Sequence, residues 1–294
     1  MVTQTNDENS FDQVVQRIVS TITQAGIKQK VLSTENSEDI IFATELAHIM
    51  CNQIAAFNSP CFFNVGVEGR PKQASACFLL DVEDNMESIL DWMKTEALIF
   101  KGGSGSGVNV SKLRASGEPI HPRGSSSGPL SFMAAADGVA GAIKSGSVAR
   151  RAAKMVIMDV DHPDIEEFIK CKQTAEDILR KFKEIDGEID VNSDILNYIP
   201  YQNANNSVSV TDKFMKAVKN DENWFLEPRT TGGVQSVVRA KELFHKIAET
   251  AWNCADPGLF YYDNVNKWHT MTNEGPIITS NPCVTGDTMI MTLN

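Results

Sequence analysis

The chain has 294 residues, of which 42% are hydrophobic and 22% charged, enough apolar side chain for one large domain or two small ones. Its net charge of −11 argues against a non-specific nucleic-acid binder, which needs a basic surface, although glycine loops can still hold phosphates locally. No run of roughly 18 apolar residues and no Cys-x-x-Cys pair occurs. We therefore expect a cytoplasmic protein with no membrane span, no disulfide framework and no zinc site.

Hydrophobic spacing predicts a short helical beginning followed by alternating strands and helices. Helices are expected over residues 11–25, 37–55, 85–101 and 240–252, and beginning at 129, 163 and 212. Strands are expected over residues 61–67, 74–81, 108–110, 154–160, 206–210 and 259–265. The intervening loops are expected at 102–107, 117–128 and 173–200. This alternation indicates βαβ units and a largely parallel α/β sheet.

Four segments carry chemistry-bearing residues in a fixed order. They are Ser-Ala-Cys-Phe at 75–78, the glycine run at 100–114, the blocks at 127–132, 143–153 and 161–168, and Ser-Asn-Pro-Cys at 280–283. No single segment is specific, because glycine and serine runs are more often linkers. Taken together, over roughly residues 57 to 283, they resemble ribonucleotide reductases, and most closely the adenosylcobalamin-dependent class.

The resemblance implies both a fold and a reaction. The fold is the first half of a ten-stranded α/β barrel at 57–282, preceded by a helical N-terminal region at 1–56. Because half a barrel leaves strand edges open, this segment alone is expected to be unstable and inactive. The reaction is the reduction of ribonucleotides to deoxyribonucleotides for DNA synthesis through a thiyl radical, with adenosylcobalamin generating the radical.

The resemblance also implies roles for single residues. Cys77 is one of two reducing thiols, Cys283 occupies the thiyl position, and Asn281 hydrogen-bonds the substrate ribose. The substrate-binding positions are Ser59, Ala76, Ser104, Gly105 and Asn281. A lone cysteine on a strand is usually a small buried hydrophobe, so the interpretation of Cys77 depends on its neighbouring motifs. The cysteines at 51, 61, 171 and 254 match no reactive position and are expected to be structural.

An allosteric site is implied as well. Asp84 and Arg114 match a site at a homodimer interface where deoxynucleotides or ATP bind, and Arg150 and Arg151 lie in a matching adjustable loop at 145–154. The alternatives are that Asp84 only caps its helix and that the arginine pair is solvated. The implied partners are a ribonucleoside diphosphate or triphosphate and a thioredoxin-type reductant, with no nucleic acid and no membrane.

The sequence departs from the family pattern after Cys283. The family continues Asn-Pro-Cys-x-Glu, whereas Thr285 stands here in place of the glutamate. The run Cys-Val-Thr-Gly-Asp-Thr at 283–288 resembles the beginning of an intein, whose first cysteine attacks the preceding peptide carbonyl. We therefore expect residues 283–294 to begin an intein, with a divergent or truncated frame as the alternative.

Two other functions remain open at this point. One is the large subunit of a reductase that takes its radical from a separate metal-containing subunit. The other is a non-catalytic nucleotide sensor that keeps Asp84 and Arg114. Substitution of Cys77 distinguishes an enzyme from a sensor.

Overall fold

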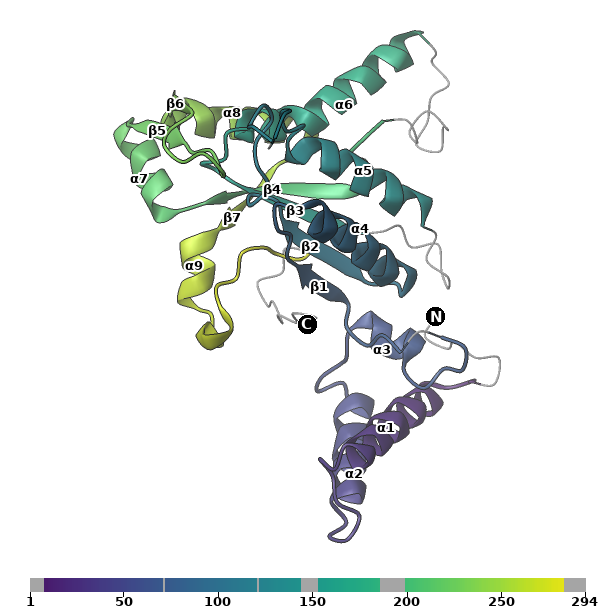
Figure 1. Ribbon diagram of the computed structural model, residues 1–294. Coiled ribbons are helices and arrows are strands. Elements are labelled where there is room, and N and C mark those ends of the chain that lie inside the picture. Colours follow the sequence, from purple (N-terminus) through teal and green to yellow (C-terminus); the bar gives the residue numbers. More distant parts are fainter. Residues whose placement is uncertain (1–7, 71, 121, 144–152, 186–198, 283–294) are drawn as a thin grey trace. The chain divides into compact units, whose positions relative to one another are not determined.

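The computed structural model describes residues 8–282, except residues 71, 121, 144–152 and 186–198 (Figure 1). The chain divides into two compact units, residues 1–76 and 77–294.

The first unit is helical. It contains α1 (Phe11–Lys28), α2 (Glu38–Cys51) and α3 (Ser59–Asn64). Ser10 and Gln13 form a capping box that begins α1, whose apolar side packs on α2. The strand expected at 61–67 is wrong, because Pro60 stands in the first turn of α3, where its fixed φ and missing N–H favour a helix start.

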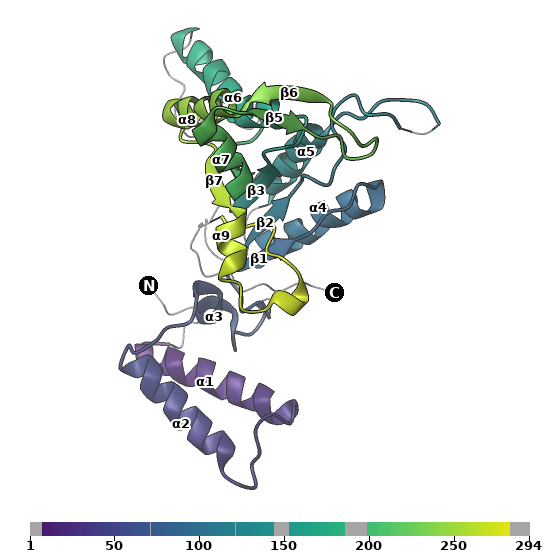
Figure 2. The ribbon, with the colours of Figure 1, turned by 90° about the vertical axis from the view of Figure 1, so that its left-hand side faces the viewer.

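The second unit is built on a parallel five-stranded sheet with the order β1-β2-β3-β4-β7 (Figures 1 and 2). These strands are β1 (Cys77–Leu80), β2 (Gly105–Asn109), β3 (Lys154–Asp159), β4 (Ala204–Val210) and β7 (Gly258–Tyr261). The expected parallel α/β arrangement is confirmed. An antiparallel hairpin of β5 (Asn223–Leu226) and β6 (Ser236–Arg239) was not expected from the sequence.

Helices cover one face of this sheet. They are α4 (Met86–Lys101), α5 (Pro129–Ala142), α6 (Ile165–Ile185), α7 (Asp212–Asn220) and α8 (Ala240–Cys254). Alternate strand residues such as Val108, Val156 and Val208 point into a continuous core with these helices. Burial of this apolar surface is the main force that holds the layer together.

The other face carries a smaller apolar cluster. Met155, Ile157 and Phe260 pack there with Ile277 and with residues of α9 (Tyr262–Lys267). A short 3-10 turn, Thr272–Glu274, follows α9, and the chain then runs back along this face. We call residues 277–282 the return segment.

Several element boundaries differ from expectation, and helix α2, expected to reach residue 55, ends at Cys51. Helix α6 continues to Ile185, so the irregular segment expected from 173 is wrong as far as that residue. The strand expected at 259–265 ends at Tyr261, where α9 follows. Residues 105–107 lie in β2 and not in a loop. Among the described residues, no helix is both long and apolar enough to span a membrane.

Candidate active site

Strand β2 presents two different faces. Val108 packs into the core with the helices, and the Ser106 hydroxyl donates a hydrogen bond to Glu96 of α4. Because side chains alternate along a strand, Gly105, Gly107 and Asn109 lie on the opposite face. The glycines therefore leave bare backbone on the face that the helices do not cover.

The return segment lies directly against this bare backbone. A Cβ built on Gly107 would stand 1.9 Å from the carbonyl oxygen of Ser280. One built on Gly105 would stand 2.8 Å from Cγ of Pro282. Glycine is needed at both positions because another part of the chain occupies the space of a side chain.

Asparagine side chains fix the return segment in this place. The Asn109 amide donates hydrogen bonds to the carbonyl of Ile278, at 2.9 Å, and to Asp159, at 3.1 Å. Asn205 of β4 donates to the carbonyl of Pro282 at 3.2 Å, and Asn266 of α9 makes two bonds of 2.8 and 2.9 Å to the first residue of the segment. The segment is therefore held along its whole length.

Cys77 is on the same face of the sheet. It is the register partner of Gly105, and it lies two residues before Leu79, whose Cδ2 is 3.3 Å from the Cβ position of Gly107. The thiol is half-buried at the first residue of β1. The structure thus brings the Asn281-Pro282 end of the return segment to Gly105 and its register partner Cys77, both of which precede it by more than 170 residues in the sequence.

Asn281 contributes an unusual group. Its Oδ1 is buried and has no hydrogen-bond partner among the described residues. A buried acceptor without a partner costs roughly 1–3 kcal/mol, so such atoms are rare in stable folds. This oxygen is available to accept a hydrogen bond from a ligand.

The other predicted substrate and thiyl positions are placed as follows. Ser104 is buried immediately before β2, and its N–H donates to the carbonyl of Ile99 at 3.2 Å. Ser59, exposed in the first turn of α3, and Ala76 belong to the first compact unit. Cys283 lies outside the described residues.

Asp84 and Arg114 form an ion pair. The Arg114 Nε donates to an Asp84 carboxylate oxygen at 2.7 Å, and its backbone N–H donates to the other oxygen at 3.2 Å. Asp84 does not cap α4, because Asn85 accepts the capping bond from Ser88. Arg150 and Arg151, predicted for the same site, lie outside the described residues.

The environment of three other cysteines fits a structural role. Burial raises the pKa of Cys171 to about 12, and its sulfur accepts a hydrogen bond from Asn206. Burial also raises the pKa of Cys61 and of Cys254. Because the thiolate is the reactive form, these thiols are poor nucleophiles.

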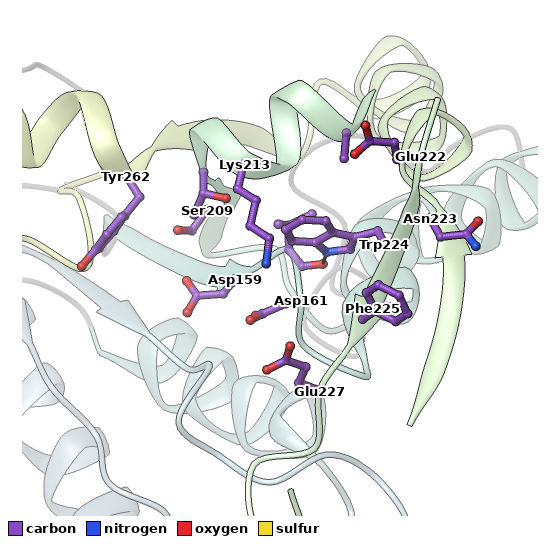
Figure 3. A pocket seen from close by; sticks show the side chains of 13 residues that line it. Asp159, Asp161, Ser209, Lys213, Glu222, Asn223, Trp224, Phe225, Glu227 and Tyr262 are labelled. Atoms are coloured by element: carbon purple, nitrogen blue, oxygen red, sulfur yellow. Dashed lines mark hydrogen bonds between the residues drawn. The ribbon is translucent and has the colours of Figure 1, made fainter. Parts of the chain in front are cut away.

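A cavity of about 500 Å³ opens at the carboxyl ends of β3 and β4, and sequence reasoning missed it. Figure 3 shows the carboxylates of Asp159, Asp161 and Glu227 gathered around the end of the Lys213 side chain. Burial raises the pKa of Asp159, and Asp161 is paired with Arg229 at 2.7 Å. A lining so rich in carboxylates disfavours a phosphate ligand. The signal in the sequence is Asp159-Val160-Asp161 at the end of a strand.

The family profile described as ribonucleotide reductase, barrel domain, matches residues 75–285, so the chain belongs to the ribonucleotide reductases. A second profile, described as class II vitamin B12-dependent ribonucleotide reductase, matches residues 1–53 and assigns the chain to the vitamin B12-dependent class.

Relatives in several organisms support this assignment. The chain is 51% identical over 276 residues to the vitamin B12-dependent ribonucleotide reductase of Streptomyces coelicolor, covering 94% of this chain and 28% of the relative. It is 39% identical over 307 residues to that of Rhodopirellula baltica, covering 94% and 29%. It is 36% identical over 227 residues to the vitamin B12-dependent ribonucleoside-diphosphate reductase of Thermoplasma acidophilum, covering 77% and 26%. The chain thus spans little more than a quarter of these relatives.

Proposed function

We propose that the protein containing this chain reduces ribonucleotides to deoxyribonucleotides by a thiyl-radical mechanism. The observation that carries the proposal is the packing of Ser280 and Pro282 on Gly107 and Gly105. Pro282 rests on Gly105, and Cys77 is the register partner of Gly105 on the neighbouring strand. A radical thiol and a reducing thiol must both reach one ribose, and the closeness of Pro282 to this pair of strands supports the proposal.

Each of these groups has one step in the proposed reduction, and the steps balance in atoms and electrons. A thiyl at the position after Pro282 removes the 3′-hydrogen of the ribose, and the 2′-hydroxyl leaves as water after protonation. Cys77 and a second thiol supply two electrons and become a disulfide, and the 3′-hydrogen then returns to the sugar. Asn281 Oδ1, buried and without a hydrogen-bond partner among the described residues, accepts a hydrogen bond from a ribose hydroxyl. Ser104 and Gly105 contribute to the substrate site on this face of the sheet.

The substrate, effectors and partners follow from the same assignment. We propose a ribonucleoside diphosphate as substrate, because the Thermoplasma relative is named for one. Asp84 and Arg114, already paired, open to receive the sugar hydroxyl and phosphate of a deoxynucleotide or ATP, together with Arg150 and Arg151. A homodimer, a thioredoxin-type reductant and a cytoplasmic setting complete the proposal.

Adenosylcobalamin supplies the initiating radical when it is bound, as the class implies. Among the described side chains, no group of three or more histidines, cysteines or carboxylates is arranged to hold a metal ion. We assign no cobalt ligand to this part of the chain, and no step above passes through the cofactor.

Cys77→Ser is the test of this function, with Cys51→Ser, at an exposed position of α2, as the matched control. In the complete protein, Cys77→Ser should abolish turnover with a dithiol reductant while nucleotide binding persists. Cys51→Ser should retain full turnover. Normal turnover of Cys77→Ser would reject the reducing role, and loss of turnover in both variants would reject its specificity.

A second activity is proposed for the residues after Pro282. Thr285 in place of glutamate, and Gly286-Asp287-Thr288 after it, favour an intein whose first residue is Cys283. In that case the thiyl cysteine arrives with the downstream segment after splicing. Mass spectrometry of the expressed full gene product tests this idea. A spliced protein reading Asn-Pro-Cys-x-Glu supports it, and an unspliced chain continuing through Thr285 contradicts it.

A further inference from the structure

A buried ionic cluster lies next to β2, on the helix-covered face of the sheet. Glu96 of α4 and Lys154 of β3 are each 1% exposed, and their Oε2 and Nζ atoms are 2.5 Å apart. The Ser106 hydroxyl donates to the other glutamate oxygen at 2.7 Å. The lysine Nζ also lies 4.9 Å from the centre of the Trp92 ring.

This cluster is connected directly to the bare backbone of β2. Ser106 lies between the two glycines on which the return segment rests, and it is the register partner of Lys154. The Ser106 N–H donates to the carbonyl of Ala153, the residue before Lys154, at 3.0 Å. A displacement of Glu96 or Lys154 is therefore transmitted to β2 by two contacts. One is the Ser106 side chain, and the other is the Ser106 N–H bond to the Ala153 peptide.

Stability alone does not explain such a cluster. Removing two charges from water is costly, and well-packed apolar residues of similar size often stabilise a fold as well or better. A charged pair does have directional bonds, which fix one arrangement of α4, β2 and β3. Apolar side chains at the same positions would tolerate small displacements of α4, β2 and β3 relative to one another more readily.

We infer that Glu96 and Lys154 are positioning residues. Through Ser106 they fix the position of β2, and β2 in turn fixes the position of the return segment in the candidate active site. The inference rests on the proposed function. Neither residue touches the substrate face, since both side chains lie on the opposite side of the sheet. Their effect on the reaction is therefore transmitted by Ser106 and the backbone of β2.

The test separates stability from turnover in the complete protein. Glu96→Gln alone leaves a buried lysine without its charged partner and should lower both the melting temperature and kcat. Adding Lys154→Met removes that charge and keeps the side chain over Trp92, so the melting temperature should recover. A positioning role predicts that kcat, measured on folded protein, stays about 10²-fold below the unsubstituted protein, with KM nearly unchanged.

The matched control is the partly exposed pair of Glu166 on α6 and Lys246 on α8, 2.9 Å apart. Glu166→Gln with Lys246→Met makes the same chemical changes and should leave both kcat and melting temperature unchanged.

The outcomes are distinct. Recovery of both melting temperature and kcat in the Glu96→Gln, Lys154→Met protein would overturn the inference and leave the proposed function intact. Absence of ribonucleotide reduction by the unsubstituted protein would overturn both. Recovered stability with kcat still low supports the inference.

Discussion

Gly107→Ala tests the contact between β2 and the return segment. The added methyl would stand 1.9 Å from the carbonyl oxygen of Ser280, whereas even tight Cβ contacts begin near 3.0 Å. The peptide of Ser280 must therefore retreat by about 1 Å, and Asn281 must move with it. Overpacking of this kind costs typically 1–3 kcal/mol of stability.

The larger effect is expected on catalysis. A misplacement of about 1 Å in a reacting group lowers rates by about 10²-fold, equivalent to about 2.7 kcal/mol of barrier. We expect kcat of the complete protein to fall by that factor in a deoxyribonucleotide assay. Gly105→Ala should have a smaller effect, because its methyl meets the edge of the Pro282 ring at 2.8 Å and a backbone carbonyl oxygen, that of Ala153, only at 3.0 Å.

Gly138→Ala provides the matched control. Gly138 lies in α5, and in the described part of the chain nothing beyond its own neighbours and helix backbone stands within 4 Å of its Cβ position. This substitution should stabilise the protein by up to about 1 kcal/mol and leave kcat unchanged. A Gly107→Ala protein with more than half of normal kcat would refute the reasoning, because the return segment would then not need its observed position.

Two further predictions concern stability and regulation. Burial lowers the pKa of His162 to about 4 from its usual 6.5, so the folded chain stays neutral there while the unfolded chain gains a proton. Stability is then lost as the pH falls from about 6.5 toward 4, by roughly 2 kcal/mol at pH 5, and His162→Gln should remove this loss in urea unfolding. Equal pH slopes in both proteins would contradict the assignment. Asp84→Asn should weaken deoxynucleotide effector binding by about tenfold or more, while Glu87→Gln in the first turn of α4 should not. Unchanged effector affinity of Asp84→Asn in equilibrium binding would exclude Asp84 from the effector site.

Local signals predicted much of the fold. The capping positions and apolar stripes of α1 and α4, and the proline at the start of α5, are encoded within a few residues of each helix. The parallel sheet followed from the alternation of strands and helices. The hairpin of β5 and β6 did not, because its strands have four residues each and the pattern is too short to distinguish from a loop.

The candidate site was only partly predictable. The resemblance named Cys77, Gly105 and Asn281, but no local pattern shows that residues 280–282 lie on β2, since that contact joins distant parts of the chain. The sequence predicts a loop at 102–107 because glycine and serine runs are usually linkers, and the close approach that explains these glycines in β2 is a tertiary feature. Glu96 carried no signal of its own, because a glutamate within a helix usually faces water.

One assay of the complete protein tests the proposed ribonucleotide reduction and the role of Cys77 most directly. Ribonucleoside diphosphate is incubated with adenosylcobalamin and a dithiol, with no other protein, and deoxyribonucleotide is measured with Cys77 intact and with Cys77→Ser. We predict product only with Cys77 intact. Product that requires a separate metal-containing subunit would contradict the cobalamin-dependent reduction. Product that forms equally well in the Cys77→Ser protein would contradict the role of Cys77 as a reducing thiol.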